Sequence, residues 1–263
     1  MNKIIISGED IKIENHDGIE VSIGEASKFL NVQSVNLKFL KDTNLVIEAN
    51  EVDVKLDFYI NILAGVKANI YEYKCNGDYK FQYKYYLEED SFLNIEKIND
   101  GKEVKEMTVI NLNGERARVN FNLKTVSKHD EKYNFLVYHN AKNTVSNIVN
   151  NGVNILNGEL EFNVSGFVSN GITGCDINQS ARIINMTDNI CMIKPNLFID
   201  EEDVVANHSA LIGTFSSDEI FYLMSRGISK EESFNLLTKG FLLNGVTYYK
   251  DVLEEIINKY WRW

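Results

Sequence analysis

Proline, cysteine, long apolar runs and positive charge are all scarce in this chain. Its 263 residues include one proline and three cysteines, and 38 acidic residues against 27 lysines and arginines give a formal net charge of −11. The acidic excess argues against a nucleic-acid partner, because phosphate binding needs a basic face. No apolar run reaches the length of a membrane span, and Met1-Asn2-Lys3 leads into a short strand-like segment instead of a signal peptide. The sequence therefore predicts a cytoplasmic protein.

The cysteines, Cys75, Cys175 and Cys191, form no CxxC pair and no zinc-finger spacing. An odd number at wide spacing argues against a disulfide framework, and each can be a small buried hydrophobic residue. Because proline is so rare, asparagine and glycine must supply the turns.

Short apolar or alternating runs recur from residue 3 to residue 168, at intervals of about ten residues. Residues 117–126 alternate strictly, as a strand with one buried face does. This spacing predicts an all-β sandwich, barrel or solenoid. The late asparagines favour the solenoid, because their amides can stack between turns; they are Asn143, Asn147, Asn150, Asn151, Asn154, Asn157, Asn163 and Asn170. No exact repeat is visible.

After residue 213 the pattern changes to short amphipathic helices. Ser216 with Glu219, and Ser229 with Glu232, have the spacing of capping boxes. Arg226-Gly227 between them predicts a helix end. The last helix, from about Thr247, has one apolar face made of Leu253, Ile256, Ile257 and Tyr260.

The segments 193–213 (IKPNLFIDEEDVVANHSALIG) and 218–241 (DEIFYLMSRGISKEESFNLLTKGF) resemble the SufB/SufD family of iron–sulfur cluster assembly proteins. The residues that carry the resemblance are Pro195, Leu197, Ile199, Asp203, Val204, His208, Ala210, Gly213, Phe221, Tyr222, Leu223, Ser225, Arg226, Gly227, Ile228, Glu231, Glu232 and Phe241. A looser match upstream includes His139, Asn157-Gly158 and Asn178-Gln179.

The resemblance implies a mainly β fold, a right-handed parallel β-helix over 1–213 followed by a helical segment over 214–263 that docks an ATPase. It also implies a non-catalytic scaffold subunit of a SUF-type assembly complex. Such a subunit pairs with a second SufB/SufD-like chain, as a homodimer or a heterodimer, and binds a SufC-type ABC ATPase. A transient iron–sulfur cluster is then possible, and any nucleotide is bound by the partner and not by this chain.

Two departures make the chain more similar to SufD than to SufB. The SufB branch has a functional cysteine directly after the glutamine that matches Gln179, where this chain has Ser180. The SufB branch also has a glutamate after the histidine that matches His208, where this chain has Ser209. Cys175, five residues before Ser180, can serve a compensating role.

His208 is the first candidate ligand, because a neutral imidazole binds iron while its other nitrogen needs an acceptor, which the partner subunit can supply. Cys175 and Cys191 are the second, since thiolates are the natural ligands of iron–sulfur clusters and a solenoid can bring them onto neighbouring turns. Cys75 lies near a strand end, with no role assigned. The alternatives without a functional role are that His208 is an ordinary surface residue and that the cysteines are buried core residues. The acidic run Asp200–Asp203 is typical of a solvated turn.

The expected ATPase contacts are Phe221, Tyr222, Arg226, Gly227, Ile228, Glu231 and Phe234. Alternatively, the helix pair 216–241 caps the open end of the solenoid. No catalytic triad or phosphate-binding loop is recognisable. The rival functions are a structural β-solenoid adaptor without a cluster and a β-helix polysaccharide lyase or acyltransferase.

Overall fold

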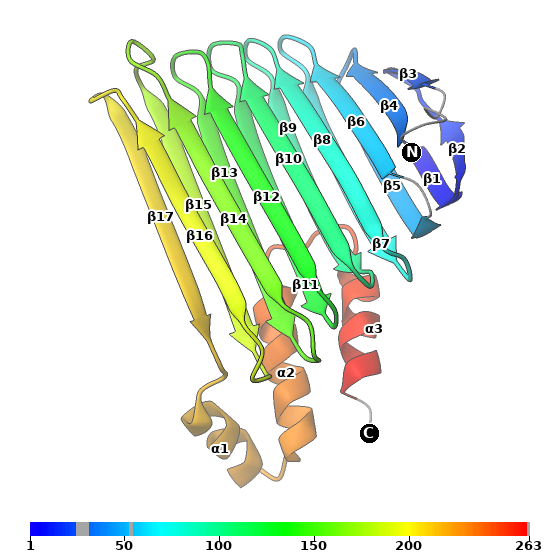
Figure 1. Ribbon diagram of the computed structural model, residues 1–263, viewed down its shortest axis with the longest axis vertical. Coiled ribbons are helices and arrows are strands. Elements are labelled where there is room, and N and C mark those ends of the chain that lie inside the picture. The colour runs from blue at the N-terminus through cyan, green and yellow to red at the C-terminus, as the bar shows by residue number, and fades with distance from the viewer. Residues whose placement is uncertain (25–31, 53–54, 262–263) are drawn as a thin grey trace.

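Two mainly parallel sheets face each other, and from the fourth strand on successive strands alternate between them, in a computed structural model that describes residues 1–24, 32–52 and 55–261 (Figure 1). The nine-stranded sheet contains, from its C-terminal edge, β17 (Val204–Gly213), β15 (Cys175–Asn185), β13 (Val145–Asn154), β11 (Arg118–Ser127), β9 (Phe92–Asp100), β7 (Lys67–Cys75), β5 (Thr43–Val52), β1 (Asn2–Gly8) and β2 (Asp10–Asn15). The eight-stranded sheet contains β16 (Cys191–Ile199), β14 (Leu160–Val168), β12 (Glu131–His139), β10 (Val104–Leu112), β8 (Tyr79–Leu87), β6 (Lys55–Ile62), β4 (Val32–Phe39) and β3 (Ile19–Gly24).

The strands form a parallel β-solenoid of about 7 turns, which confirms the predicted fold class. Each turn takes one strand from each sheet, so the ten-residue interval in the sequence marks single strands and not whole turns. Ile70 lies opposite Ile95 in the middle of the solenoid, whereas Ile148 lies opposite Gln179 near its C-terminal end. The turns therefore lengthen toward that end, which is why no exact repeat is visible in the sequence.

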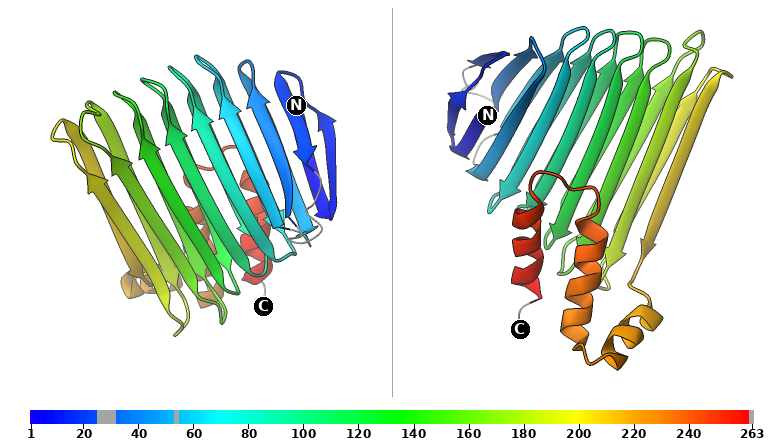
Figure 2. Two further views of the ribbon diagram at one scale, coloured as in Figure 1. Left: turned by 45° about the horizontal axis from the view of Figure 1, so that its top comes forward. Right: turned by 180° about the vertical axis from the view of Figure 1, so that it is seen from behind.

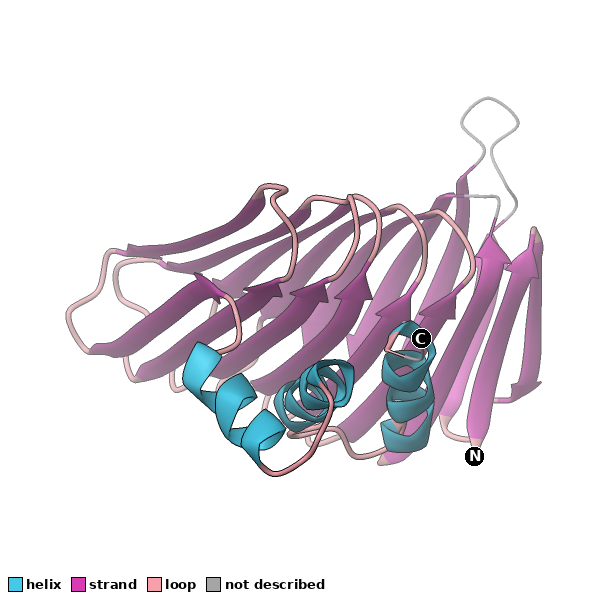
Figure 3. Ribbon diagram, turned by 90° about the horizontal axis from the view of Figure 1, so that it is seen from below, coloured by secondary structure: helices cyan, strands magenta, loops and turns pink. Residues whose placement is uncertain are grey.

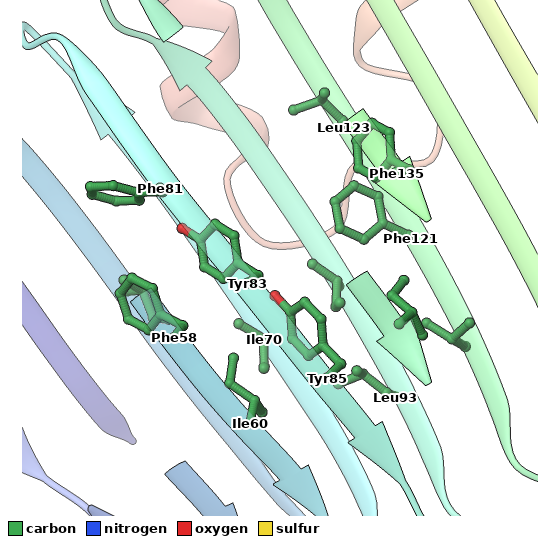
Figure 4. Close-up of a cluster of buried hydrophobic side chains, with 14 of the residues drawn as sticks. Phe58, Ile60, Ile70, Phe81, Tyr83, Tyr85, Leu93, Phe121, Leu123 and Phe135 are labelled. Carbon is green, nitrogen blue, oxygen red and sulfur yellow. The ribbon is translucent and has the colours of Figure 1, made fainter. Parts of the chain in front are cut away.

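Inward-facing side chains fill the space between the sheets with aromatic and branched aliphatic groups (Figure 4). The Phe58 and Tyr83 rings stack with their centroids 4.8 Å apart, and Phe121 meets Phe135 edge-on at 4.9 Å. Inward and outward side chains alternate along the strands, as the burial of β8 and β10 shows, and this alternation makes the packing possible.

Asparagine amides stack between turns on the outside of the sheets. Asn163 accepts from Asn196 and donates to Asn134, at 3.3 and 3.2 Å. Asn44 and Asn69 form a similar pair at 2.8 Å. The predicted stacking is confirmed for Asn163, one of the late asparagines.

A buried ion cluster lies inside the solenoid, formed by Glu72, Lys74, Lys97 and Glu106, all at most 3% exposed. Lys97 contacts Glu106 at 2.8 Å and Glu72 at 3.2 Å, and Lys74 contacts both carboxylates. Burial alone would raise the pKa of Glu106, but the two ammonium groups lower it to about 2. The two positive and two negative charges balance each other, which allows four ionised groups to remain in the core.

The C-terminal helices are α1 (Ser217–Ser225), α2 (Lys230–Leu242) and α3 (Lys250–Tyr260). Ser229 and Glu232 form the predicted capping box, and Gly227 ends the preceding turn with φ of +87°. The box predicted at Ser216 is wrong, because the Ser216 hydroxyl accepts from the Asp218 amide and not from that of Glu219. None of the helices in the described ranges has the length and apolar character needed to cross a bilayer.

α2 and α3 lie along the outer face of the nine-stranded sheet, near the ends of its strands, and α1 lies beyond those ends (Figures 2 and 3). A second apolar core forms there between sheet and helices, with Val126 and Val153 under Leu242, Leu253 and their neighbours. The alternative that helices 216–241 cap the end of the solenoid is wrong, because this core lies on the side of the sheet and, within the part of the chain that the structure describes, β16 and β17 keep exposed apolar side chains.

We expect Lys97→Met to lower the free energy of unfolding by about 3 kcal/mol, because two buried carboxylates would then share one ammonium group. The matched control is Lys132→Met, which removes a half-exposed partner of Glu161 and should cost less than about 1 kcal/mol. Urea unfolding followed by circular dichroism measures both. Equal losses in the two variants would contradict the assignment of the cluster to the core.

The carboxyl group of Glu131 is buried beside Thr125 and Tyr133, which donate to it at 2.6 and 2.9 Å. Burial raises its pKa to about 7. A raised pKa means that the folded state holds the proton more tightly, so the stability from this group is present below the unfolded pKa and is lost as pH rises toward 7.

Glu131→Gln should therefore be more stable than the wild type at pH 8, by up to about 3 kcal/mol, and nearly equal to it at pH 4.5. His139, whose pKa burial lowers to about 4, affects both proteins alike and cancels in the comparison. Denaturant unfolding across this pH range measures the difference. A difference that does not change with pH would show that Glu131 has an ordinary pKa.

Candidate functional site

The C-terminal end of the solenoid exposes two strand edges. β16 and β17 are the last strands of their sheets, so each has a neighbour on one side only. Pro195 lies in β16, an edge strand, where a missing amide N–H is tolerated. Apolar side chains are exposed on these strands, among them Phe198, Val205 and Leu211. The end of the solenoid is therefore both apolar and able to pair with another strand.

His208 lies in the middle of β17 and is exposed. The parallel register places it opposite Gln179 of β15, on the side that faces the interior in the earlier turns. No further turn follows β17, so this inward position is open to solvent.

Ser180 and Ser209 lie next to each other on the outer side of the same two strands. Their hydroxyl oxygens are 3.3 Å apart. These are the positions at which the SufB resemblance would place a cysteine and a glutamate. The structure thus brings the two departures together on the face opposite to that of His208.

Cys175 and Cys191 do not meet. Cys175 begins β15 opposite Val204, while Cys191 begins β16 opposite Leu160 in the other sheet. Because β15 separates them along its whole length, they are at opposite ends of one turn. The expectation that they lie on neighbouring turns is wrong, since a turn here takes about thirty residues and not sixteen.

The surroundings of the three cysteines are those of weakly reactive thiols. Cys175 is buried, with its sulfur 3.3 Å from the Thr144 hydroxyl. Burial raises the thiol pKa of both Cys75 and Cys191, which are half-buried. Across the described ranges, no three His, Cys, Asp or Glu side chains gather as a metal site.

The acidic run Asp200–Asp203 forms a turn stabilised by its own backbone. The Glu201 carboxylate accepts from the amides of Gly171, Glu202 and Asp203, at 2.8 to 3.3 Å. These bonds lower the pKa of Glu201. The Glu201 carboxylate is thus used to stabilise the turn.

Two of the predicted ATPase contacts, Phe221 and Tyr222, lie on α1. Of the others, Arg226, Gly227 and Glu231 are exposed, and Ile228 and Phe234 are half-buried. Phe221 and Tyr222 are 74% and 57% exposed, and α1 has no buried residue. The Arg226 guanidinium lies over the Tyr222 ring at 5.3 Å. A groove of about 560 Å³ separates α1 from the end of β15 and is lined by Met186, Phe215, Ile220, Phe221, Met224 and Phe234 among others. In Figures 1 and 2 α1 projects away from the sheets.

α3, in contrast, packs on the sheet, and one carboxylate binds the backbone at its start. Glu96 of β9 accepts from the amides of Thr247, Tyr248 and Tyr249 and from the Thr247 hydroxyl, at 2.7 to 3.2 Å. At the other end of α3, the Tyr260 hydroxyl contacts Lys128 at 2.6 Å. The first turn of this helix has no side-chain cap of its own, so Glu96 supplies the negative charge that a helix N-terminus favours.

The sequence of this chain is similar to those of known proteins. The family described as "SUF system FeS cluster assembly, SufBD core domain" matches residues 56–241. The chain belongs to the SufBD family. The chain is 32% identical over 148 residues to the iron-sulfur cluster assembly protein SufD of Bacillus subtilis. SufBD family proteins of Mycobacterium leprae and Pyrococcus horikoshii are 30% identical over 106 residues and 46% identical over 44.

The match to the Bacillus SufD covers 55% of this chain and 34% of the relative. Those to the Mycobacterium and Pyrococcus proteins cover 40% and 17% of this chain, and 12% and 9% of the relatives. The SufBD chain therefore spans about a third or less of the curated relatives it matches. The likeness to SufD agrees with the SufD-like character predicted from Ser180 and Ser209.

We expect Glu96→Ala to loosen α3, at a cost of about 2 kcal/mol, because three backbone amides lose their acceptor. Hydrogen exchange of the amides of residues 247–257 should accelerate. The matched control is Asn94→Ala, two residues earlier on the same face of β9, which should leave this exchange unchanged. Wild-type exchange rates in Glu96→Ala would show that the apolar contacts alone hold α3.

Proposed function

We propose that this chain is a non-catalytic scaffold subunit of a SUF-type iron–sulfur cluster assembly complex in the cytoplasm. The observation that carries the proposal is the presence of two separate exposed surfaces on one SufBD solenoid. One is the edge of β16 and β17 with His208, and the other is α1 with Phe221 and Tyr222. Residues 1–213 then serve as the pairing core and residues 214–263 as the docking segment.

A second SufB/SufD-like chain pairs with the strand edge. Unpaired backbone groups on β17 provide hydrogen bonds, and exposed side chains such as Val205 and Leu211 provide apolar contact. His208 is then enclosed at the junction of the two chains. Either a second copy or a different family member fits this geometry.

The SufC-type ATPase binds α1 and the turn that follows it. Phe221 and Tyr222 act as aromatic anchors, with Arg226, Glu231 and Lys230 at the polar rim. Gly227, Ile228 and Phe234 complete the contact. The partner hydrolyses ATP. The conformational change of the ATPase is transmitted to the solenoid through the helices.

The iron–sulfur cluster is cargo of the complex. His208 offers one nitrogen ligand at the open edge, and the second chain supplies the remaining ligands. Cys175 and Cys191 are at opposite ends of one turn, so they cannot bind the same cluster in this conformation. We propose them as ligands only if the chain changes conformation when the cluster is assembled.

A structural adaptor without a cluster is the second candidate. It is favoured by the paired hydroxyls of Ser180 and Ser209 at the positions where SufB has ligand-type residues. Anaerobic reconstitution of the ATPase complex with iron and sulfide separates the two candidates. If the wild type shows charge-transfer absorbance and His208→Ala does not, the cluster-binding scaffold is supported. If the wild type shows no such absorbance, the adaptor without a cluster is supported.

Binding to the ATPase should weaken at least tenfold when Phe221 and Tyr222 are both replaced by alanine, because the interface loses its two most exposed aromatic side chains. Isothermal titration calorimetry of the full chain with the SufC-type ATPase measures this. Leu236→Ala, an exposed apolar residue of α2 outside the proposed contact, is the matched control. Wild-type affinity in the double variant would refute the docking site.

A further inference from the structure

The carbonyl oxygen of the Gln179 side chain is an unused buried acceptor. Gln179 is 4% exposed, and its Oε1 is buried without a hydrogen-bond partner. Leaving such an oxygen unpaired is costly, so a native chain that keeps one calls for an explanation. The residue opposite Gln179 in the parallel register is His208.

The surroundings fix which end of the Gln179 amide is free. Its Nε2 donates to the backbone carbonyl of Asn196 in β16, at 3.4 Å. Reversing the amide would place two carbonyl oxygens against each other. Oε1 is therefore held as the end that remains available to another donor.

The space for this amide depends on a glycine. A Cβ at Gly166 of β14 would lie 3.1 Å from Nε2 of Gln179 and 3.3 Å from a methyl group of Leu197. Any larger residue at this position would press on the amide. The position of the Gln179 side chain is thus set from two strands, β14 and β16.

The nearby amide donor is already engaged. Nδ2 of Asn196 donates to Asn163, to Ser165 and to the Lys194 carbonyl, each at 3.3 Å. His208, by contrast, is on the neighbouring strand about 4.8 Å away, on the same side, with an imidazole that carries an N–H.

We propose that Gln179 is a positioning residue that accepts a hydrogen bond from one ring nitrogen of His208. The bond selects one tautomer and holds the ring, which leaves the lone pair of the other nitrogen directed out of the open edge. The acceptor that a ligating histidine needs is then within the same chain, and the partner subunit does not have to supply it. The use of the free nitrogen as a ligand rests on the proposed function, whereas the hydrogen bond itself does not.

The test is the tautomer of His208, read from its imidazole ¹⁵N shifts in the free full-length chain at a pH where the ring is neutral. The chain has four histidines, and the spectrum of His208→Gln identifies the signals of interest. We expect one pyrrole-type and one pyridine-type nitrogen in the wild type. In Gln179→Met, which is of similar size but lacks the acceptor, the difference between the two shifts should fall by at least half.

Asn178→Ala is the matched control, because Asn178 is on the same strand but faces outward and binds Asn207 at 3.3 Å. It should leave the His208 shifts unchanged. If Gln179→Met does not fold, Gly166→Ala displaces the same amide while Gln179 remains. Averaged tautomers in the wild type, or an unchanged ring in the folded variant, would overturn the proposal. The spectra need no iron and no ATPase, so failure of the proposed function leaves their result standing.

Discussion

Backbone hydrogen bonding between successive turns in parallel register is the constraint on which the rest of this structure depends. The register keeps the same side of each strand facing inward through the whole solenoid, so that aromatic rings and even a balanced ion cluster can stack in the core. The same hydrogen bonding cannot end without leaving unpaired groups. At the C-terminal end these groups are on β16 and on β17, the strand that carries His208.

The tail is divided into a fixed part and a free part. α3 is bound to the sheet through Glu96 and through the apolar core under Leu253 and Ile257. α1 has no buried residue and is connected to the rest through short segments on either side. A partner bound to α1 would therefore act on the SufBD solenoid through β17, because only residues 214–216 connect β17 to α1.

Local patterns predicted the strands and the boundary between α1 and α2. They favoured the solenoid over a sandwich or a barrel, and the family resemblance implied the parallel β-helix. The capping box at Ser229 and Glu232 and the stop at Gly227 need only neighbouring residues. β13 runs unbroken through Asn150, Asn151 and Gly152, which continue the ladder although asparagine and glycine were expected to supply turns. The number of residues in one turn could not be predicted from the sequence. The prediction that Cys175 and Cys191 lie on neighbouring turns was therefore wrong.

The contacts that fix the candidate site are long-range. Glu96 meets Thr247 across 151 residues, and no local pattern marks it. Gln179 stood in the looser part of the family resemblance, but its free oxygen follows only from the positions of Asn196 and Gly166 on other strands. Residue type and spacing can name His208 as a candidate; the three-dimensional register is needed to say what orients it.

The central claim is that the strand edge and α1 are separate binding surfaces on one chain. Hydrogen exchange measured with and without the SufC-type ATPase tests it most directly, because both surfaces report in one experiment. We predict that the ATPase protects the amides of residues 217–234, while the direct contact leaves those of β16, β17 and α3 unchanged. Protection centred on α3, or on the outer face of the eight-stranded sheet, with none on α1, would contradict it.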